Sequence, residues 1–489
     1  MSAPTTETTS GTTSKRSSTS DSDRVEDGPA ADSATEFALV TEYFHPDTAS
    51  TGQLMTDLAV GLVERGLDLS VYTGQPNYHS GDNERQPRRE THEGVPVRRI
   101  RAPQVRQSSL PRRLFNWAVF TVWMVGALAR DRTDDRELLF VSNPPVLPPA
   151  MWLLCRLKGW EYTYVVYDLY PDVIAASGYI ERGGVVYRAW AKLNEYVFGD
   201  ARRVVALGPV MRDRIAEAGG EDFDPGKVEV VHNWADGEFI RPLDKDENPF
   251  SAEHGLVDEF TLVYSGNIGA NHDLETAVEA AREFADEAVR FLIIGEGDRK
   301  SEVVSLAESY GLRGDTVTFL PYQDLADLPH TLTCGDASLV AVSEGMEGLC
   351  VSSKLYTSLA AGQPVLVVSH PEDDEARIVE SHDAGMQVSQ GDVAGMVRVV
   401  ETWRSNPDLV ERQGRNAREA FENHFTREQS VDEYYRLLAE GGDAKPRTAS
   451  TGESSSSAED SEPTPASTAE SGSSADGAAE SGGDAAWTS

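Results

Sequence analysis

Lysine is scarce in this chain of 489 residues: only 8 of its 44 basic residues are Lys, and the other 36 are Arg. Acidic residues number 81, so the formal net charge is −37. Because a nucleic-acid-binding surface needs a basic face, this balance excludes a general DNA- or RNA-binding protein and predicts no nucleic-acid partner.

The excess of acidic residues is not confined to the ends of the chain. Residues 1–34 and 443–489 together hold 15 acidic and 5 basic residues, and the 408 residues between them hold 66 acidic and 39 basic residues, a net charge of −27. High ionic strength screens repulsion of this kind. The composition therefore favours a salt-adapted protein of haloarchaeal type over an ordinary acidic cytosolic protein.

Cysteine is also rare, and no cysteines have the spacing of a metal site. Cys155, Cys334 and Cys350 are an odd number without a CxxC motif, which excludes a disulfide framework and argues against a zinc site. The N-terminal segment has no apolar stretch of the kind found in secretory signals. These absences favour a reducing, cytoplasmic location.

The hydrophobic pattern predicts two α/β domains between disordered acidic tails at 1–34 and 443–489. Short apolar runs alternate with helical periodicity, which is typical of βαβ units on parallel sheets. Strands are expected at 37–40, 69–72, 138–141, 162–167 and 204–207, and then at 261–264, 291–294, 317–320, 338–342 and 364–368. The polar segment at 239–258, between the two series of strands, is predicted to be a linker. It separates a doubly wound first domain at 35–238 from a doubly wound second domain at 259–425. A C-terminal helix at 426–442 is expected to pack back on the first domain.

No apolar stretch reaches the ~20 residues needed to span a bilayer, but residues 114–129 come near it. This segment contains Trp117, Phe120 and Trp123 and follows a local cluster of arginines at 98–113. Two interpretations stay open: a buried helix of the first domain, or a membrane-surface helix whose flanking arginines meet lipid headgroups.

Two glycine-containing loops follow predicted strands of the second domain. Ser265–Gly269 (SGNIG) lies before a helix, where backbone N–H groups and the helix N-terminus can approach an anion. Gly295–Asp298 (GEGD) allows the same close approach, although turns use such glycines equally often. The dinucleotide-binding motif GxGxxG is absent from both and from the loop after the first strand, so these loops do not predict an NAD site.

Two further loops carry charged residues suited to sugar or phosphate chemistry. In the segment 344–354 (EGMEGLCVSSK), a carboxylate beside Gly348 can accept hydrogen bonds from sugar hydroxyls, and Lys354 can compensate the charge of a diphosphate. Asp168 leaves the end of the strand at 162–167, where a substrate of the first domain would lie. An Asp in this place can also cap the next helix.

At these loops the chain resembles the family-4 glycosyltransferases, retaining enzymes of the two-domain GT-B fold, and most of all their WbuB-like group, which builds surface polysaccharides and lipid-linked oligosaccharides. The resemblance extends from about Phe37 to Leu438. It is carried, in order, by 43–47 (YFHPD), 72–78 (YTGQPNY), 142–145 (SNPP), 168–172 (DLYPD), 232–236 (HNWAD), 265–269 (SGNIG), 353–356 (SKLY) and 360–362 (AAG).

The resemblance implies a role for each domain across the cleft between them. The second domain would bind a nucleotide-diphosphate sugar, UDP- or GDP-linked, through Gly266, Asn267, Gly269, Gly295, Gly297, Tyr322 and the backbone of Gly348 and Leu349. The first domain would bind the acceptor through Ser50, Thr51, Asn77, Tyr78 and Asp172. The catalytic residues would be Glu347, which matches the first glutamate of the family's E-x7-E motif, together with Lys354 and Asp168.

Three departures from the family pattern involve four positions. Thr357 stands where the second glutamate of the motif usually binds the ribose, although nine residues rather than seven separate it from Glu347, so the sequence leaves the nucleotide open. Ala49 and Ser50 replace a Gly-Gly pair that allows close approach to phosphates. Tyr167 replaces a histidine often found just before the first-domain aspartate, which makes Asp168 the better polar candidate.

The resemblance implies transfer of a hexose-type sugar to a lipid-linked or glycan acceptor with retention of the anomeric configuration. The acceptor hydroxyl would attack from the face of the leaving group, and a phosphate oxygen would take its proton. No bound metal is implied, and the acidic pairs Asp222/Asp224 and Asp244/Asp246 fit a charged surface. Two alternatives remain: a nucleotide-sugar epimerase of the same fold, and a non-catalytic partner of another transferase that binds sugar nucleotides.

Overall fold

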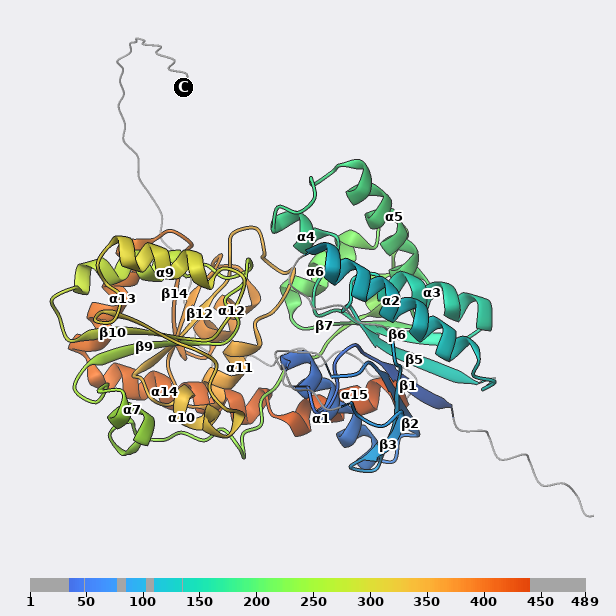
Figure 1. Ribbon diagram of the computed structural model, residues 1–489, viewed down its shortest axis with the longest axis horizontal. Helices are drawn as coiled ribbons and strands as arrows, with labels where there is room; N and C mark the ends of the chain where they lie inside the picture. The colour runs from blue at the N-terminus through green and yellow to red at the C-terminus, as the bar shows by residue number, and fades with distance from the viewer. Residues whose placement is uncertain (1–34, 48, 77–84, 103–109, 134, 440–489) are drawn as a thin grey trace, which may run out of the picture. The chain divides into compact units, whose positions relative to one another are not determined.

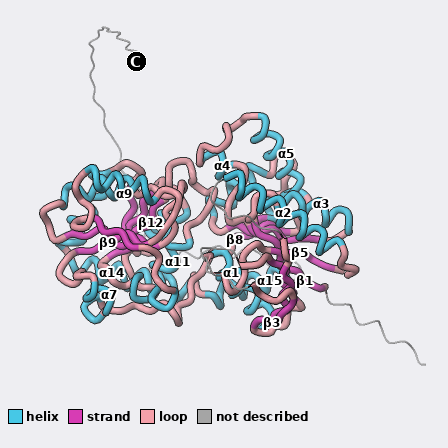
Figure 2. Tube along the Cα trace, in the orientation of Figure 1, coloured by secondary structure: helices cyan, strands magenta, loops and turns pink. Residues whose placement is uncertain are grey.

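The computed structural model describes residues 35–47, 49–76, 85–102, 110–133 and 135–439 (Figure 1). These residues form two parallel-sheet α/β domains, and Figure 2 shows helices on the faces of both sheets. The predicted acidic tails lie outside the described residues.

The first sheet has eight strands in the order β3-β4-β2-β1-β5-β6-β7-β8, and all neighbouring pairs except β3 and β4 are parallel. The chain order reverses on either side of β1, which is the position where doubly wound sheets bind ligands. The strands are β1 (Glu36–Val40), β2 (Leu69–Thr73), β3 (Arg89–His92), β4 (Val95–Arg99), β5 (Arg136–Val141), β6 (Glu161–Val165), β7 (Arg203–Ala206) and β8 (Val228–Val230).

Helices cover both faces of this sheet (Figure 1). They are α1 (Ser50–Glu64), α2 (Leu110–Ala129), α3 (Leu147–Lys158), α4 (Asp172–Ala176), α5 (Val185–Gly199) and α6 (Pro209–Ala218), with the 3₁₀ turn η1 (Pro225–Lys227). Central strands such as β1 and β5 are buried along nearly their whole length, which explains their apolar runs at 37–40 and 138–141.

The second sheet has six parallel strands in the order β11-β10-β9-β12-β13-β14. Its strands are β9 (Phe260–Ser265), β10 (Val289–Ile294), β11 (Val317–Leu320), β12 (Ala337–Ala341), β13 (Val365–Val368) and β14 (Gly385–Val388). Its helices are α8 (Glu275–Ala280), η3 (Ala281–Phe284), α9 (Lys300–Ser309), η4 (Leu325–Asp327), α10 (Leu328–Leu332), α11 (Ser353–Ala360), α12 (Asp374–Ser381), α13 (Val393–Ser405) and α14 (Pro407–His424).

The segment predicted as a linker is more ordered than its polar sequence indicates. It contains η2 (Lys245–Glu247) and α7 (Pro249–Glu253). Phe250 and Leu256 are buried against strands of the second sheet, and Lys245 forms an ion pair with Asp336 at 2.6 Å. The apolar contacts of Phe250 and Leu256 therefore hold the second half of the segment 239–258 against the second domain.

The last described helix, α15 (Arg427–Ala439), returns to the first domain and packs against α1. Arg65, directly after α1, forms an ion pair with Asp432 at 2.6 Å. A Cβ atom on Gly61 would lie 2.7 Å from Val431, so the small residue at this position allows the two helices to approach closely. The chain thus crosses between the two domains twice.

Helix α2 buries one face in the first domain and exposes another, so the buried-helix interpretation holds for one face and membrane contact through the other stays a prediction. Phe120, Met124 and Leu128 are buried in the core of the first domain. Leu114, Phe115, Val122 and Trp123 are 48%, 50%, 62% and 47% exposed. The expectation that Phe120 belongs to a membrane-facing surface is wrong, because its helical spacing with Met124 turns it toward the sheet. Among the described residues, no helix combines the length and apolar character that crossing a bilayer demands.

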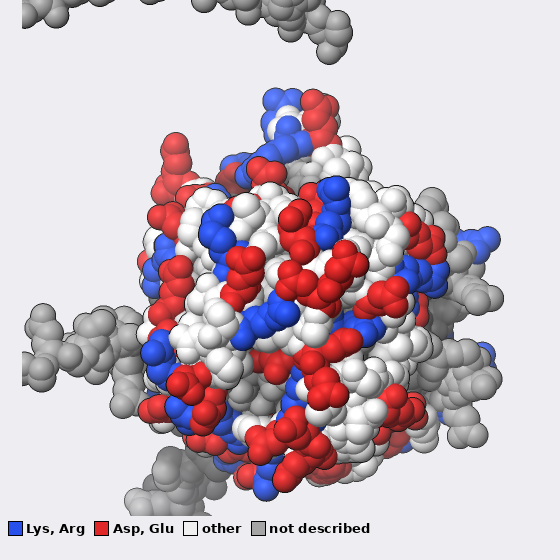
Figure 3. Space-filling model, turned by 90° about the vertical axis from the view of Figure 1, so that its left-hand side faces the viewer, with Lys and Arg blue, Asp and Glu red and all other residues white. Residues whose placement is uncertain are grey.

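Acidic side chains are spread over the visible face of the molecule in Figure 3, with basic side chains between them rather than gathered in one patch. Many of the ion pairs are exposed, as are Arg415 with Glu411 and Arg156 with Asp200. Exposed pairs contribute only about 0–1 kcal/mol each. The negative net charge of the folded body is therefore the larger electrostatic effect.

Candidate functional site

Two glycine loops of the second domain lie against each other at the carboxyl ends of β9 and β10. A Cβ atom on Gly295 would lie 1.8 Å from the carbonyl oxygen of Gly266, and one on Gly297 would lie 2.1 Å from that of Ile268. Gly266 and Gly295 also have φ angles of 143° and 148°, which non-glycine residues rarely adopt. The two loops predicted to contact a donor are thus one continuous surface, and its close packing requires glycine.

Lys354, in the first turn of α11, reaches this surface from the side. Its Cε would lie 2.5 Å from a Cβ atom placed on Gly266, and its Nζ lies 5.2 Å from the centre of the Tyr264 ring. Among the described residues, no carboxylate lies within ion-pair distance of this ammonium group. Burial lowers the pKa of Lys354 to about 8, and the charges of Cys350 and Glu375 oppose this shift only in part. A largely buried cation without an anionic partner is a ready site for an anion.

His272 is a component of the site that the sequence did not reveal. Its Nε2 lies 3.0 Å from Lys354 Nζ, and its Nδ1 accepts a hydrogen bond from the N–H of Gly269 at 3.2 Å. Burial, and then the Lys354 charge, hold the pKa of His272 well below its usual range, so the ring is neutral. A single histidine between a glycine loop and a helix carries no signal that would distinguish it from a structural residue.

Most of the backbone donors predicted to contact phosphate are already engaged. The N–H of Gly348 donates to Asp373 at 3.1 Å, and that of Leu349 donates to Met346 at 2.9 Å. The amides of Gly266, Gly269 and Gly295 also have partners within the protein. The loop amides that the sequence emphasised are therefore mostly bonded within the protein, and Lys354 is the charged group of this surface that an anion would meet.

The loop that contains Glu347 lies against the first domain. The carbonyl oxygen of Leu349 accepts a hydrogen bond from the N–H of Leu169 at 2.8 Å, and Cys350 forms an isolated β-bridge with Asp168. The Glu347 carboxylate accepts a hydrogen bond from the N–H of Gly345 at 3.0 Å within its own loop. The half-buried side chain therefore has remaining acceptor positions for sugar hydroxyls.

Asp168 is half-buried and lies directly beside this loop. Its Oδ2 accepts a hydrogen bond from Asn143 Nδ2 at 2.8 Å, and its N–H donates to Ser142 Oγ at 2.9 Å. Burial raises the pKa of Asp168, and the hydrogen bonds of Asn143 and Tyr170 partly oppose the rise. Since the residues that hold it follow β5 and β6, Asp168 is fixed where these two neighbouring strands end.

The residues predicted to bind the acceptor lie in different parts of the first domain. Ser50 and Thr51 begin α1, directly after the loop that follows β1. Asp172 begins α4, and its Oδ1 accepts a hydrogen bond from Tyr187 at 2.6 Å. Asp172 and Leu349 also line a cavity of about 270 Å³, together with Tyr187 and Arg214. Asn77 and Tyr78 lie outside the described residues.

Glu42 is a second residue that sequence reasoning missed. It follows β1 in the loop before Ser50 and is buried. Burial, and then the neighbouring Asp47 carboxylate, raise the pKa of Glu42 to about 8, so most of this carboxyl group carries a proton at neutral pH. Its position directly after an apolar strand could have identified Glu42 as a candidate, but the sequence does not indicate that its side chain is buried.

Tyr322 and Thr357 lie at the margin of the surface that the sequence predicts to bind the donor. The ring of Tyr322 is 38% exposed and follows β11, next to the Gly295 loop. Thr357 donates a hydrogen bond from its hydroxyl to the carbonyl of Lys354 at 3.0 Å, one turn back in α11. The residue that replaces the expected second glutamate is thus directed toward its own helix.

The geometry combines the Lys354 ammonium group, which has no ion-pair partner among the described residues, with the half-buried Asp168 carboxyl group of the other domain. Both lie beside loops that follow central strands of two Rossmann-like sheets. This two-domain arrangement is the GT-B class of fold. Residues 51–234 match the glycosyl transferase 4-like domain, and residues 245–420 match the glycosyl transferases group 1. The chain therefore belongs to the glycosyltransferases that combine these two domains, and the predicted fold class is confirmed.

Curated relatives and solved structures agree with this assignment. The probable glycosyltransferase WbjE of Pseudomonas aeruginosa is 26% identical over 292 residues, 59% of this chain and 70% of the relative. The putative colanic acid biosynthesis glycosyl transferase WcaI of Escherichia coli K12 is 26% identical over 347 residues, 69% of this chain and 84% of the relative.

Among solved structures, sucrose-phosphate synthase of Thermosynechococcus elongatus has a TM-score of 0.66 at 15% identity, covering 82% of this chain and 98% of that protein. HepE of Anabaena, solved in complex with UDP, has a TM-score of 0.63 at 12% identity, and the match covers 83% of this chain and 100% of that protein. At these identities the likeness establishes the fold alone.

Proposed function

We propose that this protein transfers a hexose-type sugar from a UDP- or GDP-linked donor to a lipid-linked or glycan acceptor, with retention of the anomeric configuration and without a bound metal ion. The observation that carries the proposal is the unpaired, largely buried Lys354 beside the glycine loops of β9 and β10. The proposal also draws on WcaI, a relative named for colanic acid biosynthesis, and on HepE, a structural neighbour solved with UDP-glucose.

The proposed mechanism gives each charged group a separate task. The diphosphate of the donor lies against the Gly266–Gly295 surface, and Lys354 stabilises the negative charge that grows on it as the bond to the sugar breaks. Glu347 accepts hydrogen bonds from the hydroxyls of the donor sugar. Asp168 orients the attacking hydroxyl of the acceptor, and a phosphate oxygen on the same face of the sugar takes the proton.

A transfer assay tests the proposal. Purified protein is incubated with radiolabelled UDP- and GDP-sugars, a lipid extract from its own source as acceptor, and a chelator. We expect label to enter the extract, one nucleoside diphosphate to be released per sugar, and NMR of the product to show the anomer of the donor. Conversion of the donor without an acceptor would indicate an epimerase, and neither reaction with any donor would indicate a non-catalytic partner.

Donor binding is expected to weaken as the pH rises through about 8. Lys354 is charged below its pKa of about 8 and neutral above it, and a diphosphate binds the charged form. Above pH 8 the affinity for UDP should fall by up to about tenfold per pH unit, with uptake of a proton on binding. Calorimetric titration in two buffers of different ionisation enthalpy measures both effects. An affinity that stays constant from pH 7 to 9.5 would contradict the role of Lys354.

We also propose that the enzyme works at the inner face of the cell membrane through α2. A helix that is apolar on its core side and also on its exposed side has a surface suited to lipid. Because the net charge of −27 on the body repels anionic lipids, the attachment depends on this apolar surface, with the nearby arginines in support.

The membrane proposal predicts that the protein floats with vesicles of its native lipids and stays bound in molar salt. Replacing Leu114, Phe115 and Trp123 with Ser should weaken binding about 10²-fold, because each removes roughly 1 kcal/mol of apolar burial. Phe120 is left in place, since it belongs to the core. The exposed Leu325 of the second domain provides the control, L325S. Wild-type protein that does not float would show that the acceptor is reached in another way.

A further inference from the structure

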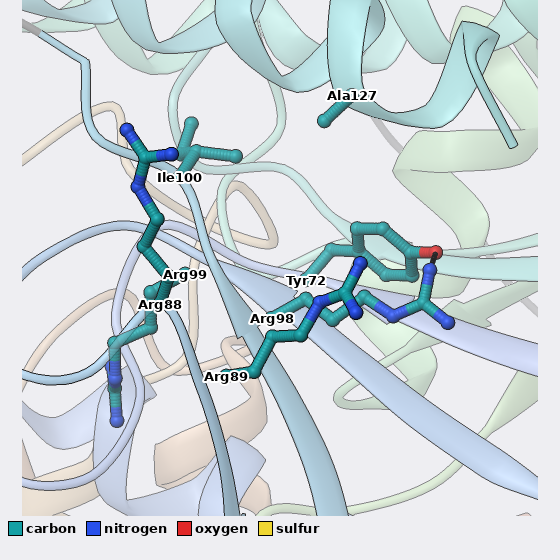
Figure 4. A pocket seen from close by; sticks show the side chains of 7 residues that line it. All are labelled: Tyr72, Arg88, Arg89, Arg98, Arg99, Ile100 and Ala127. Atoms are coloured by element: carbon teal, nitrogen blue, oxygen red, sulfur yellow. Dashed lines mark hydrogen bonds between the residues drawn. The ribbon is translucent and has the colours of Figure 1, made fainter.

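The first domain has a cavity of about 550 Å³ that the proposed reaction does not use. It lies at the edge of the sheet formed by β2, β3 and β4 and is bounded by Ala127 of α2 (Figure 4). None of the predicted catalytic or donor residues lines it. The residues around it are Tyr72, Arg88, Arg89, Arg98, Arg99, Ile100 and Ala127.

Strand pairing sets three of these side chains in a row. Arg98 of β4 is the register partner of Tyr72 in β2 and of Arg89 in β3, so all three lie on the same face of the sheet. Figure 4 shows the side chains of Arg89 and Arg98 extending in the same direction toward the Tyr72 ring. Like charges placed directly opposite in a sheet repel each other, so the row is unfavourable unless an anion compensates it.

The acidic residues nearby compensate only part of this charge. Arg98 Nη1 donates to Tyr72 Oη at 2.7 Å and to Asp131 Oδ2 at 2.9 Å, but Asp131 also pairs with Arg136 at 3.1 Å. Arg99 is paired with Glu90 at 2.6 Å.

Two arginines of the cavity are left without a partner. Within the described ranges, neither Arg88 nor Arg89 forms an ion pair or a hydrogen bond through its side chain, and both are exposed at the mouth of the cavity. A positive excess therefore remains around this cavity in a body whose net charge is −27.

We propose that this pocket binds a phosphate-bearing anion, either a phosphate monoester or a diphosphate. Guanidinium groups form bidentate hydrogen bonds to phosphate oxygens. A doubly charged phosphate can neutralise both Arg88 and Arg89, whereas a carboxylate ligand, with one charge, can neutralise only one of them. The volume lies within the range of small-ligand sites. The phosphate belongs either to a lipid headgroup, which the neighbouring α2 surface would admit, or to a soluble phosphate compound. The proposal does not depend on the sugar-transfer reaction.

Calorimetric titration with inorganic pyrophosphate tests the pocket. The titration is performed in the K354M background, so that the donor surface does not add to the heat. Arg89→Gln is expected to weaken binding about tenfold or more, and the double variant R88Q/R89Q to abolish it, as for the loss of charge-assisted hydrogen bonds. Arg85→Gln and Arg101→Gln remove the same charge from exposed neighbours outside the pocket and are expected to leave the affinity nearly unchanged.

Vesicles identify the source of the phosphate. If it is a lipid headgroup, R88Q/R89Q will lower sedimentation with phosphatidylglycerol-containing vesicles, and pyrophosphate will compete with the vesicles. If it is a soluble compound, vesicle binding will stay unchanged while pyrophosphate binding is lost. Pyrophosphate affinity that is unaffected by R88Q/R89Q, or lowered equally by R85Q and R101Q, would overturn the proposal.

Discussion

Replacing Lys354 with Met is expected to lower sugar transfer about 10²-fold or more without unfolding the protein. Removing one preorganised electrostatic stabiliser of a transition state typically costs 10²–10³-fold in rate. Lys354 has no carboxylate partner among the described residues, and burial already disfavours its charge, so an apolar side chain of similar length should be tolerated. The variant should therefore keep its melting temperature while losing activity.

Matched variants separate this effect from a general loss of charge or loop structure. Lys192→Met removes an exposed lysine that is paired with Glu195, and it should transfer sugar at the wild-type rate. Glu347→Ala should lower transfer to a similar extent as Lys354→Met, whereas Glu344→Ala, on an exposed residue of the same loop, should not. Near wild-type rates in both K354M and E347A would remove the donor-site assignment.

The melting temperature is expected to rise by about 10 °C between low salt and molar KCl. At 1 M salt the screening length falls to about 3 Å, so the mutual repulsion of the acidic surface is almost abolished. Relief of about 4 kcal/mol in each domain of about 200 residues corresponds to roughly 10 °C, at about 2–4 °C per kcal/mol. Salt also weakens the exposed ion pairs, but their contribution of about 0–1 kcal/mol each makes that loss smaller.

A neutral cosolute at equal osmolality controls for effects other than screening, and it should raise the melting temperature less than KCl does. Transfer activity should follow the same salt dependence as stability. A melting temperature that is flat from low salt to molar KCl would show that the acidic composition has no role in salt adaptation.

The parts of the fold that were predictable from the sequence are those with a strong hydrophobic period. Buried central strands such as β9 and β10 read as continuous apolar runs, and each of their loops contains the glycines that close packing requires. The hairpin of β3 and β4 was not predicted. Its strands are short, form one end of the sheet and contain three arginines, and its turn depends on the positive φ angles of Glu93 and Gly94.

The candidate site was predictable as a set of loops but not as a set of contacts. Lys354 stood out because lysine is so rare, whereas His272 gave no signal and is revealed only by its 3.0 Å approach to Lys354. Gly348 looked like a phosphate donor, but its N–H is bonded to Asp373, a residue 25 positions later in the chain. Such pairings depend on tertiary packing, which a single sequence does not encode locally.

The most direct test of the account is a crystal structure of the protein with bound UDP or GDP. We expect the diphosphate to lie on the Gly266–Gly295 surface with an oxygen within hydrogen-bonding distance, about 2.7–3.2 Å, of Lys354 Nζ. The sugar side of the diphosphate should face Glu347 and the Asp168 edge of the first domain. A nucleotide whose diphosphate lies elsewhere, with Lys354 still bonded only to His272, would contradict the account.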